Sequence, residues 1–245
     1  MQTAELIRDR SALEPARPAM NLFQNEWPLY RKQVDHNCLF HREAYATLHQ
    51  VLSEEMASPF RLLDVACGDA SASIGALKDT TIAHYHGIDL SEPALDLARR
   101  NLKSLPCAVT LERGDFAEAL RDRSLSTDIA WIGLSLHHFR TPQKLEVMRD
   151  TRLIIGEHGK FLIYENAGPD GDTHDAWMER WDRQRSAWHA FTAPEWDAMT
   201  AHVHANDFPE THVTWLRLAY EAGFGRARCL YESPTQLFRL YCFDS

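Results

Sequence analysis

Three aspartates near the ends of apolar runs could together bind a nucleoside. Asp64 lies in the run that leads to Gly68. Asp89 ends the next apolar run, and Asp115 follows the third and is itself followed by Phe116. In a βαβ unit, an acid at the end of the second strand accepts hydrogen bonds from ribose hydroxyls, and a turn of small residues before a helix aims backbone N–H groups at a ligand. The spacing therefore predicts a nucleoside pocket, with Asp115 for an exocyclic amine and Phe116 against the base.

The elements that position these residues are predicted to be strands and helices in alternation. Short apolar runs alternate with amphipathic segments from residue 60 onward, which is typical of a doubly wound, mostly parallel sheet. We expect seven strands, at 60–66, 82–88, 108–112, 128–134, 160–165, 227–231 and 237–243, the last two as an antiparallel hairpin. We expect helices at 91–102, 142–155 and 211–222, with Ser91 as an N-cap and Gly223 as a helix end.

The chain is predicted to form one domain with recognisable segments. Residues 1–20 are polar without clear periodicity and are expected to be a loosely ordered arm. Residues 21–55 are helical, and residues 56–166 carry the strand–helix alternation. Residues 167–209 form a helical insertion, expected above the carboxyl ends of the strands, where open sheets bind ligands. Residues 210–245 supply the last helix and the closing strands.

The first glycine-containing turn resembles a motif of the class I S-adenosylmethionine-dependent methyltransferases. The family has hh(D/E)hGxGxG, and this sequence has LLDVACGDA at residues 62–70. Asp64 and Gly68 match the motif, whereas Ala66 and Ala70 replace two of its glycines. Because a side-chain methyl fits most readily at negative φ, we expect negative φ at both alanines. The resemblance covers about residues 62–165 and implies a Rossmann-like α/β fold, an N-terminal helical lid and S-adenosylmethionine as the cofactor.

The resemblance also implies roles for the matching residues. In the family the first acid reaches the methionine ammonium, the second binds the ribose and the third binds adenine, which here are Asp64, Asp89 and Asp115. Leu90 and Phe116 would form apolar walls. With the backbone after the fourth strand and an aromatic residue from the lid, the expected cofactor-binding residues are Tyr30, Asp64, Ala66, Gly68, Asp89, Leu90, Asp115, Phe116 and Leu134.

Three residues are candidates for acid–base chemistry on the acceptor. Methyl transfer from a sulfonium is an in-line displacement in which positioning supplies much of the catalysis, and a base is needed only when the acceptor is protonated. His138 after the fourth strand, Glu165 at the end of the fifth strand and His41 in the helical lid could serve. The alternatives are structural: a polar helix start for His138, a cap for Glu165 and a permanently docked helix for His41.

The histidines and tryptophans of the chain favour neither a metal site nor an aromatic cage. The chain has 13 histidines, yet neither the His137–His138 pair nor the His202–His204 pair has a third ligand at suitable spacing, so no metal is expected. The insertion contains four tryptophans at mostly helical spacing, which favours a core stripe over a cage for a cationic or planar acceptor. Thr192 and Glu195 have the spacing of a capping box.

Composition restricts the classes of partner that the chain is expected to bind. A net charge of −9 in 245 residues disfavours a nucleic-acid binder, and the chain lacks the Asn/Asp-Pro-Pro-aromatic segment of base-methylating enzymes of related fold. Five cysteines without a CxxC pair fit the cytoplasm, and no apolar run is long enough to span a membrane. The sequence therefore predicts a cytoplasmic methyltransferase acting on a small-molecule substrate, with no nucleic-acid or membrane partner; it does not indicate an oligomeric state.

Two alternatives to this function differ in class. One is a non-catalytic module that keeps the cofactor pocket and binds a protein partner through the insertion. The other is an NAD-dependent dehydrogenase, which shares the βαβ geometry. The second is disfavoured because Asp64 would face a pyrophosphate and Ser71 stands where the third glycine of the dinucleotide motif belongs.

Overall fold

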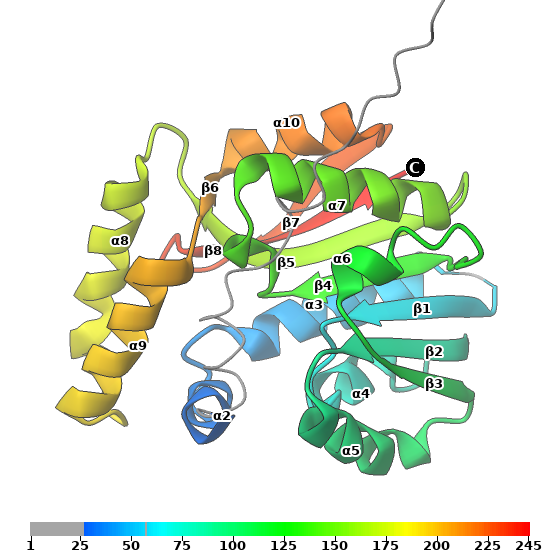
Figure 1. Cartoon of the computed structure of the whole chain (residues 1–245), viewed down its shortest axis with the longest axis horizontal. Coiled ribbons are helices and arrows are strands. Elements are labelled where there is room, and N and C mark those ends of the chain that lie inside the picture. The colour runs from blue at the N-terminus through cyan, green and yellow to red at the C-terminus, as the bar shows by residue number, and fades with distance from the viewer. Residues whose placement is uncertain (1–26, 57) are drawn as a thin grey trace, which may run out of the picture.

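A mixed β-sheet forms the centre of the structure, a computed structural model that describes residues 27–56 and 58–245 (Figure 1). Its strand order is β3-β2-β1-β4-β5-β8-β7, in which β8 pairs antiparallel with β5 and β7 and the other pairs are parallel. The strands are β1 (Phe60–Val65), β2 (Ile82–Asp89), β3 (Ala108–Arg113), β4 (Ile129–Gly133), β5 (Lys160–Gly168), β7 (Arg226–Glu232) and β8 (Phe238–Asp244). A short strand, β6 (Glu210–Thr211), pairs with the end of β5. The predicted α/β, doubly wound, seven-stranded sheet is confirmed.

Helices cover both faces of the sheet (Figure 1). One face carries α3 (His41–Glu54), α4 (Ser71–Leu77) and α5 (Glu92–Asn101), and the other carries α6 (Phe116–Ala119), α7 (Thr141–Ile154) and α10 (His212–Ala222). Leu62 and Leu63 are both buried, in the separate cores of the two faces. Strands buried on both faces read as continuous apolar runs, which is why the sequence located them. Single 3-10 turns lie at Leu102–Ser104, Leu136–His138 and Arg183–Ser186.

Two residues that were predicted to begin or end a helix do so in the structure. Ser91 accepts a hydrogen bond from the Ala94 backbone at the start of α5. Gly223 ends α10 with a φ of 94°. Because these signals depend on neighbouring residues alone, the tertiary structure does not override them.

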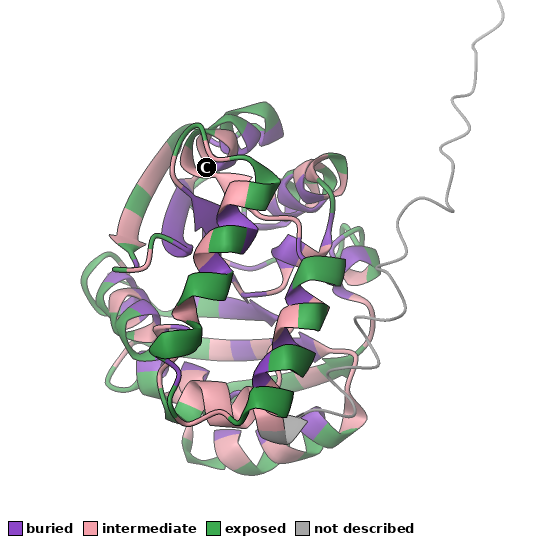
Figure 2. Ribbon diagram, turned by 90° about the vertical axis from the view of Figure 1, so that its left-hand side faces the viewer, coloured by how far each residue is buried: buried purple, intermediate pink, exposed green. Residues whose placement is uncertain are grey.

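The insertion forms two helices, α8 (His174–Asp182) and α9 (Ala193–Asn206), and the capping box of Thr192 and Glu195 is present at the start of α9. These are the two helices nearest the viewer in Figure 2, where exposed residues lie on their outer faces. Trp181 lies 5.2 Å from Trp188 and 6.1 Å from Trp196, measured between ring centroids. The four tryptophans of the insertion are buried in one cluster, as a core stripe would be: Trp177, Trp181, Trp188 and Trp196.

The expected N-terminal lid, 21–55, divides into two helices of different character. Between α2 (Trp27–Asp35) and α3 the chain turns through positive φ at Asn37 and Phe40. Helix α3 contributes several side chains to the core. In α2, by contrast, no described side chain is fully buried. The arm expected at 1–20, and the start of the lid up to residue 26, lie outside the described residues.

The described helices are short relative to a bilayer. The longest of them, α3, α7 and α9, have 14 residues each, whereas a spanning helix needs about 20. No helix in this part of the chain is long and apolar enough to cross a membrane.

Candidate functional site

A pocket opens at the carboxyl ends of β1, β2 and β4, the edge at which open α/β sheets bind ligands. All the residues expected to bind the cofactor line it, and so do His41 and His138. Glu165 does not line it. The pocket therefore brings together the cofactor-binding residues expected from sequence: Tyr30, Asp64, Ala66, Gly68, Asp89, Leu90, Asp115, Phe116 and Leu134.

The backbone of the turn after β1 differs from the prediction of negative φ at its two alanines. Ala66 and Ala70 have φ values of 55° and 54°, and Gly68 lies between them at 56°. A non-glycine residue in this left-handed region costs roughly 1–2 kcal/mol. Hydrogen bonds fix the turn despite that cost, because Gly68 donates its backbone N–H to Asp89 and the Ala70 N–H reaches the Cys67 carbonyl. The expectation of negative φ took account of the alanine methyl group but not of these hydrogen bonds.

Replacing Ala66 or Ala70 by glycine is expected to raise the free energy of unfolding by about 0.5–1 kcal/mol. The left-handed strain disappears, and the larger entropy of the unfolded glycine chain offsets only part of the gain. Denaturant unfolding of each variant measures the change. Ala201→Gly, at an exposed position inside α9, is the matched control and should lower stability by a similar amount. A loss of stability in both turn variants would contradict the strain argument.

Asp64 lies at the base of the pocket and is almost completely buried, with 2% of its surface exposed. One of its oxygens, Oδ2, accepts hydrogen bonds from the Ser73 hydroxyl at 2.5 Å and from the Tyr85 hydroxyl at 2.6 Å. Burial raises the pKa of Asp64 to about 6, although the two hydrogen bonds lower it. Ser73 and Tyr85 were not expected from the sequence, because neither stands out from the ordinary residues of its helix or strand.

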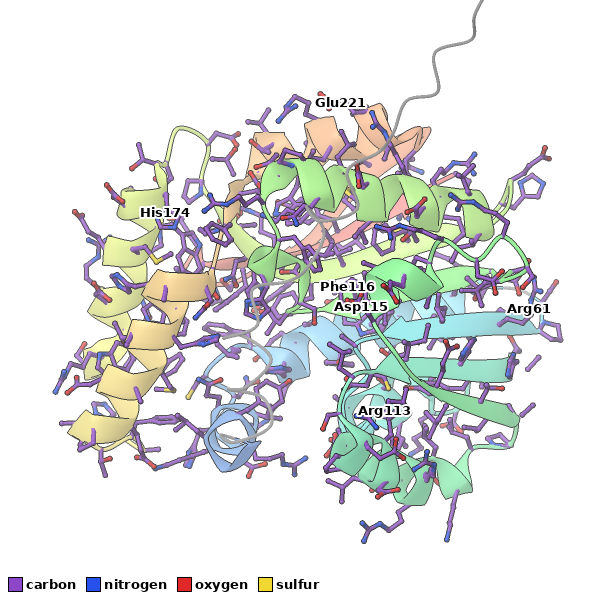
Figure 3. The ribbon with its side chains drawn as sticks, viewed as in Figure 1. Arg61, Arg113, Asp115, Phe116, His174 and Glu221 are labelled. Atoms are coloured by element: carbon purple, nitrogen blue, oxygen red, sulfur yellow. The ribbon has the colours of Figure 1, made fainter. Side chains whose placement is uncertain are left out.

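Asp89 and Asp115 line the pocket, and each also accepts hydrogen bonds from backbone N–H groups. Asp89 accepts the N–H of Gly68 on Oδ2 and the N–H of Ser91 on Oδ1, each at 2.8 Å. Burial raises the pKa of the Asp89 carboxyl. Asp115 caps α6, and Figure 3 shows it next to Phe116 at the start of that helix. Because an ionised carboxylate can accept about four hydrogen bonds, Asp89 retains acceptor capacity for ligand hydroxyls.

Aromatic residues of the two N-terminal helices close the pocket on the side facing the turn. The Tyr30 hydroxyl lies 3.3 Å from His41 Nε2, and His41 stacks on Tyr45 at 6.3 Å between ring centroids. The ring of Tyr45 in turn meets Trp131 edge-on. Burial lowers the pKa of His41 to about 4, so its ring is neutral at neutral pH. Tyr45 was missed, although it follows His41 by one helical turn and must share its face.

A second pocket adjoins the first and shares Tyr30, Leu134 and His138 with it. One part of its lining is apolar: Leu29, Leu39, Trp181, Met199, Val203 and Phe238. The polar part comprises His137, His138, Asn166, His202 and Asp207. The two pockets thus form one continuous lining in which His138 stands at the junction.

Glu165 is completely buried and holds the turn that carries the two histidines. Its carboxylate accepts the backbone N–H groups of Ser135 at 2.7 Å, Leu136 at 2.6 Å and His137 at 3.2 Å. It also lies 2.9 Å from Nδ1 of the His137 ring. With its oxygens occupied in this way and no surface in either pocket, Glu165 positions the turn rather than acting directly on a ligand. These contacts favour the structural alternative for Glu165, a cap, over a direct role on the acceptor.

Asp207, after α9, joins the histidine pair. Its Oδ1 atom lies 3.5 Å from His138 Nδ1 and 3.8 Å from His137 Nε2, while Asn166 donates to Oδ2 at 2.9 Å. Burial raises the pKa of Asp207 to about 6, although the His137 ring lowers it. No sequence signal identified Asp207, because the fold alone brings this distant segment to the 3-10 turn.

The pKa values of the two rings are shifted in opposite directions. Burial lowers the pKa of His137, but the carboxylates of Asp207 and Glu165 outweigh burial and raise it above the usual value. Burial, together with the nearby His137 and His202, holds the pKa of His138 well below the usual histidine range. His138 is therefore neutral at physiological pH, with a nitrogen lone pair that a proton or a metal ion can use.

The core of the chain is similar to a known family of domains. A family model described as "Methyltransferase domain" matches residues 62–159. No curated protein matches the chain.

Solved structures share the fold. A Bordetella parapertussis protein described as a possible exported protein is 19% identical with a TM-score of 0.64, over 83% of this chain and 67% of its own. Magnesium protoporphyrin IX methyltransferase from Synechocystis, with bound SAH, is 12% identical with a TM-score of 0.61, over 91% and 96% of the two chains. An O-methyltransferase family 2 protein from Planctomyces limnophilus, in complex with apigenin, is 15% identical with a TM-score of 0.59, over 86% of this chain and 60% of its own. The chain thus spans about two thirds of the length of the first and third structures.

Proposed function

We propose that this chain, which belongs through residues 62–159 to the family of methyltransferase domains, transfers a methyl group from S-adenosylmethionine to a small-molecule acceptor. The fold is that of the class I enzymes. The observation that carries the proposal is the convergence of Asp64, Asp89 and Asp115, from three successive strand ends, on one pocket.

The residues of the first pocket fit S-adenosylmethionine in charge. Among the described residues lining it, the carboxylates are Asp64, Asp69, Asp89 and Asp115, and the only Lys or Arg is Arg31. Arg31 is already paired with Asp69 at 2.9 Å. A ligand with a sulfonium and an ammonium group is favoured in such a field, whereas the pyrophosphate of NAD is repelled. The charge of the pocket therefore supports the methyl donor over the dinucleotide.

We assign each part of the donor to a part of the pocket. Asp64 would bind the methionine ammonium, the free acceptor positions of Asp89 would bind the ribose hydroxyls, and Phe116 would lie against adenine. We further propose that α2 alone, held by contacts such as Lys32 to Glu195 at 2.8 Å, acts as the lid. When bound, the cofactor supplies an electrophilic methyl group on a positively charged sulfur.

The second pocket is proposed to hold the acceptor. Its mostly apolar lining suits a small organic molecule, and its shared boundary at His138 would bring the acceptor to the methyl group. Two of the solved neighbours, a magnesium protoporphyrin IX methyltransferase and an O-methyltransferase bound to apigenin, support a small organic acceptor. The chain's own contribution is to hold the two reactants in line and to exclude water, which can be worth several kcal/mol of the barrier. His138 is the residue we propose to contact the acceptor at the reacting atoms.

Titration calorimetry of the full chain with S-adenosylmethionine and S-adenosylhomocysteine tests the cofactor. Absence of detectable binding of either ligand at millimolar concentration, in folded protein, would refute it. Metabolite extracts screened by mass spectrometry for products that gain a methyl group test the transfer. Binding without turnover across such extracts, together with one stably co-purifying protein, would favour a non-catalytic module instead.

The proposed setting is the cytoplasm, without a nucleic-acid or membrane partner. All five cysteines are free thiols, which a reducing compartment maintains. The net charge of −9 would repel phosphate backbones and anionic headgroups.

Affinity for S-adenosylmethionine is expected to fall as the pH drops below about 6. The pKa of Asp64 is about 6 in the ligand-free protein because of burial, and only the ionised carboxylate attracts the ammonium. The affinity is therefore full above pH 7 and declines by up to about tenfold per pH unit below pH 6. Calorimetry at pH 5, 6, 7 and 8 measures this, with Asp64→Asn as a control that should bind weakly with little pH dependence. A constant affinity from pH 7 to pH 5 would remove Asp64 from the ammonium site.

A further inference from the structure

We propose that His137, His138 and Asp207 bind a divalent first-row transition-metal ion at the polar end of the second pocket. The ligand atoms would be His137 Nε2, His138 Nδ1 and Asp207 Oδ1, and one ligand atom from each of the three residues falls within a group no more than 4.8 Å across. The sequence argued against a metal because no third ligand had suitable spacing. The fold supplies Asp207 as that third ligand.

The three ligand atoms lie close enough together to converge on one ion. Metal–ligand bonds to histidine nitrogen and carboxylate oxygen are about 2.0–2.2 Å, so ligand atoms around one ion lie about 3.0–3.4 Å apart. The Oδ1 atom of Asp207 lies 3.5 Å and 3.8 Å from the two histidine nitrogens. Asp207 would need to move by only a few tenths of an ångström, whereas the two histidine nitrogens, which lie within 4.8 Å of one another, would have to approach by up to about 1.4 Å. Two imidazoles and one carboxylate, with further positions open, are typical of catalytic zinc and non-haem iron sites.

The groups behind the three ligands have the orientation that metal sites require. Metal-binding histidines usually donate their other ring nitrogen to a carboxylate or carbonyl. Glu165 lies 2.9 Å from Nδ1 of His137, which leaves Nε2 directed toward Asp207. Asn166 occupies Oδ2 of Asp207 and so leaves Oδ1 for an ion. The contact of His138 Nδ1 with the Asn206 carbonyl is long, at 3.4 Å, and an ion bound to Nδ1 would replace it.

An unsatisfied carboxylate oxygen also favours a cation at this point. Asp207 is 5% exposed, and its buried Oδ1 atom has no hydrogen-bond partner in the described part of the chain. Leaving a buried acceptor of this kind unsatisfied costs about 1–3 kcal/mol or more. Lys144, which lowers the pKa of Asp207, is committed to Glu210 at 2.8 Å and to the Phe208 carbonyl. An ion bound between Asp207 and the two rings would satisfy the carboxylate directly.

The open positions of the ion would face the acceptor. All three ligands line the second pocket, and His138 also lines the first. If the proposed function holds, an acceptor hydroxyl bound to the ion would lie beside the transferred methyl group. The ion would lower the pKa of that hydroxyl, whose proton passes to water. The acceptor oxygen then forms its bond to the methyl carbon as the carbon–sulfur bond breaks, which leaves a neutral thioether. The site thus points to hydroxyl-bearing acceptors.

Cobalt(II) and zinc(II) titrations of the full, chelator-treated chain test the site. We expect one equivalent of Co²⁺ to bind, with visible absorption bands, and Zn²⁺ to displace it. Asp207→Asn, which keeps the size of the side chain, and His137→Gln should each weaken binding at least about 100-fold. The matched control is His204→Gln, because His204 is an exposed histidine paired with Asp182 outside both pockets. It should bind one equivalent as the unaltered chain does.

The outcomes separate this inference from the proposed function. Thermal melting confirms that each variant is folded, and calorimetry with S-adenosylhomocysteine on the same samples reports the cofactor pocket. Failure of the folded chain to bind Co²⁺ or Zn²⁺ at about 100 µM, or unchanged binding in Asp207→Asn and His137→Gln, would overturn the metal site even where the cofactor binds. Metal binding without cofactor binding would overturn the proposed function and leave the site standing.

Discussion

Replacing Asp89 by alanine is expected to weaken S-adenosylmethionine binding by at least tenfold and by as much as several hundredfold. The carboxylate has acceptor capacity for two ribose hydroxyls, and each lost charge-assisted hydrogen bond typically costs about 1.5–3 kcal/mol. The same side chain accepts the Gly68 N–H at 2.8 Å, so its removal also loosens the turn that approaches the ligand. The two effects act on the same pocket and should reinforce each other.

Calorimetric titration of the folded variant measures this effect. Asp96→Ala is the matched control, since Asp96 is an exposed carboxylate on α5 that pairs with Arg99 outside the pocket. Asp89→Asn is a milder change, because its single amide oxygen can still accept the Gly68 N–H, while the charge and the acceptor for the Ser91 N–H are lost. If Asp89→Ala bound the cofactor as the unaltered chain does, Asp89 would no longer belong to the ribose site.

The part of the cofactor pocket that sequence predicted depends on local signals. Apolar runs located β1, β2 and β3, and the carboxyl ends of neighbouring parallel strands meet at one edge of a sheet. Acids at those ends, such as Asp64 and Asp89, therefore converge whatever the loops do. The capping box at Thr192 is another local signal, and it too is present.

The parts that sequence missed depend on contacts between distant segments. The positive φ of Ala66 is maintained by the surrounding hydrogen bonds, which a consideration of the alanine methyl alone does not include. Glu165 was considered as a base because it ends a strand, but its oxygens are used by the backbone of the 3-10 turn. Asp207 reaches His138 only because the insertion folds back over the sheet edge. In each case the decisive contacts join residues that lie far apart in the sequence, so they can be identified only in the folded structure.

His138→Ala is expected to lower turnover by about 10²–10⁴-fold while leaving affinity for S-adenosylhomocysteine within about threefold. His138 lines both pockets, so its removal affects the acceptor at the reacting atoms while the aspartates that hold the cofactor stay in place. A positioned group that removes or acidifies the acceptor proton contributes rates of this size. Turnover is measured with the acceptor that the metabolite screen identifies.

The control for this variant is His84→Ala, on β2 and outside both pockets, which should keep its turnover. A loss of less than tenfold in folded His138→Ala would give His138 a structural role only.

The double variant with Asp207→Asn makes the test sharper. If the two residues act as one unit on the acceptor, the double variant should lose little more turnover than the more damaging single change, because groups that work together are strongly non-additive. Additive losses would mean that Asp207 and His138 contribute separately, and the 3.5 Å approach of their side chains would then be a packing contact without a shared chemical role.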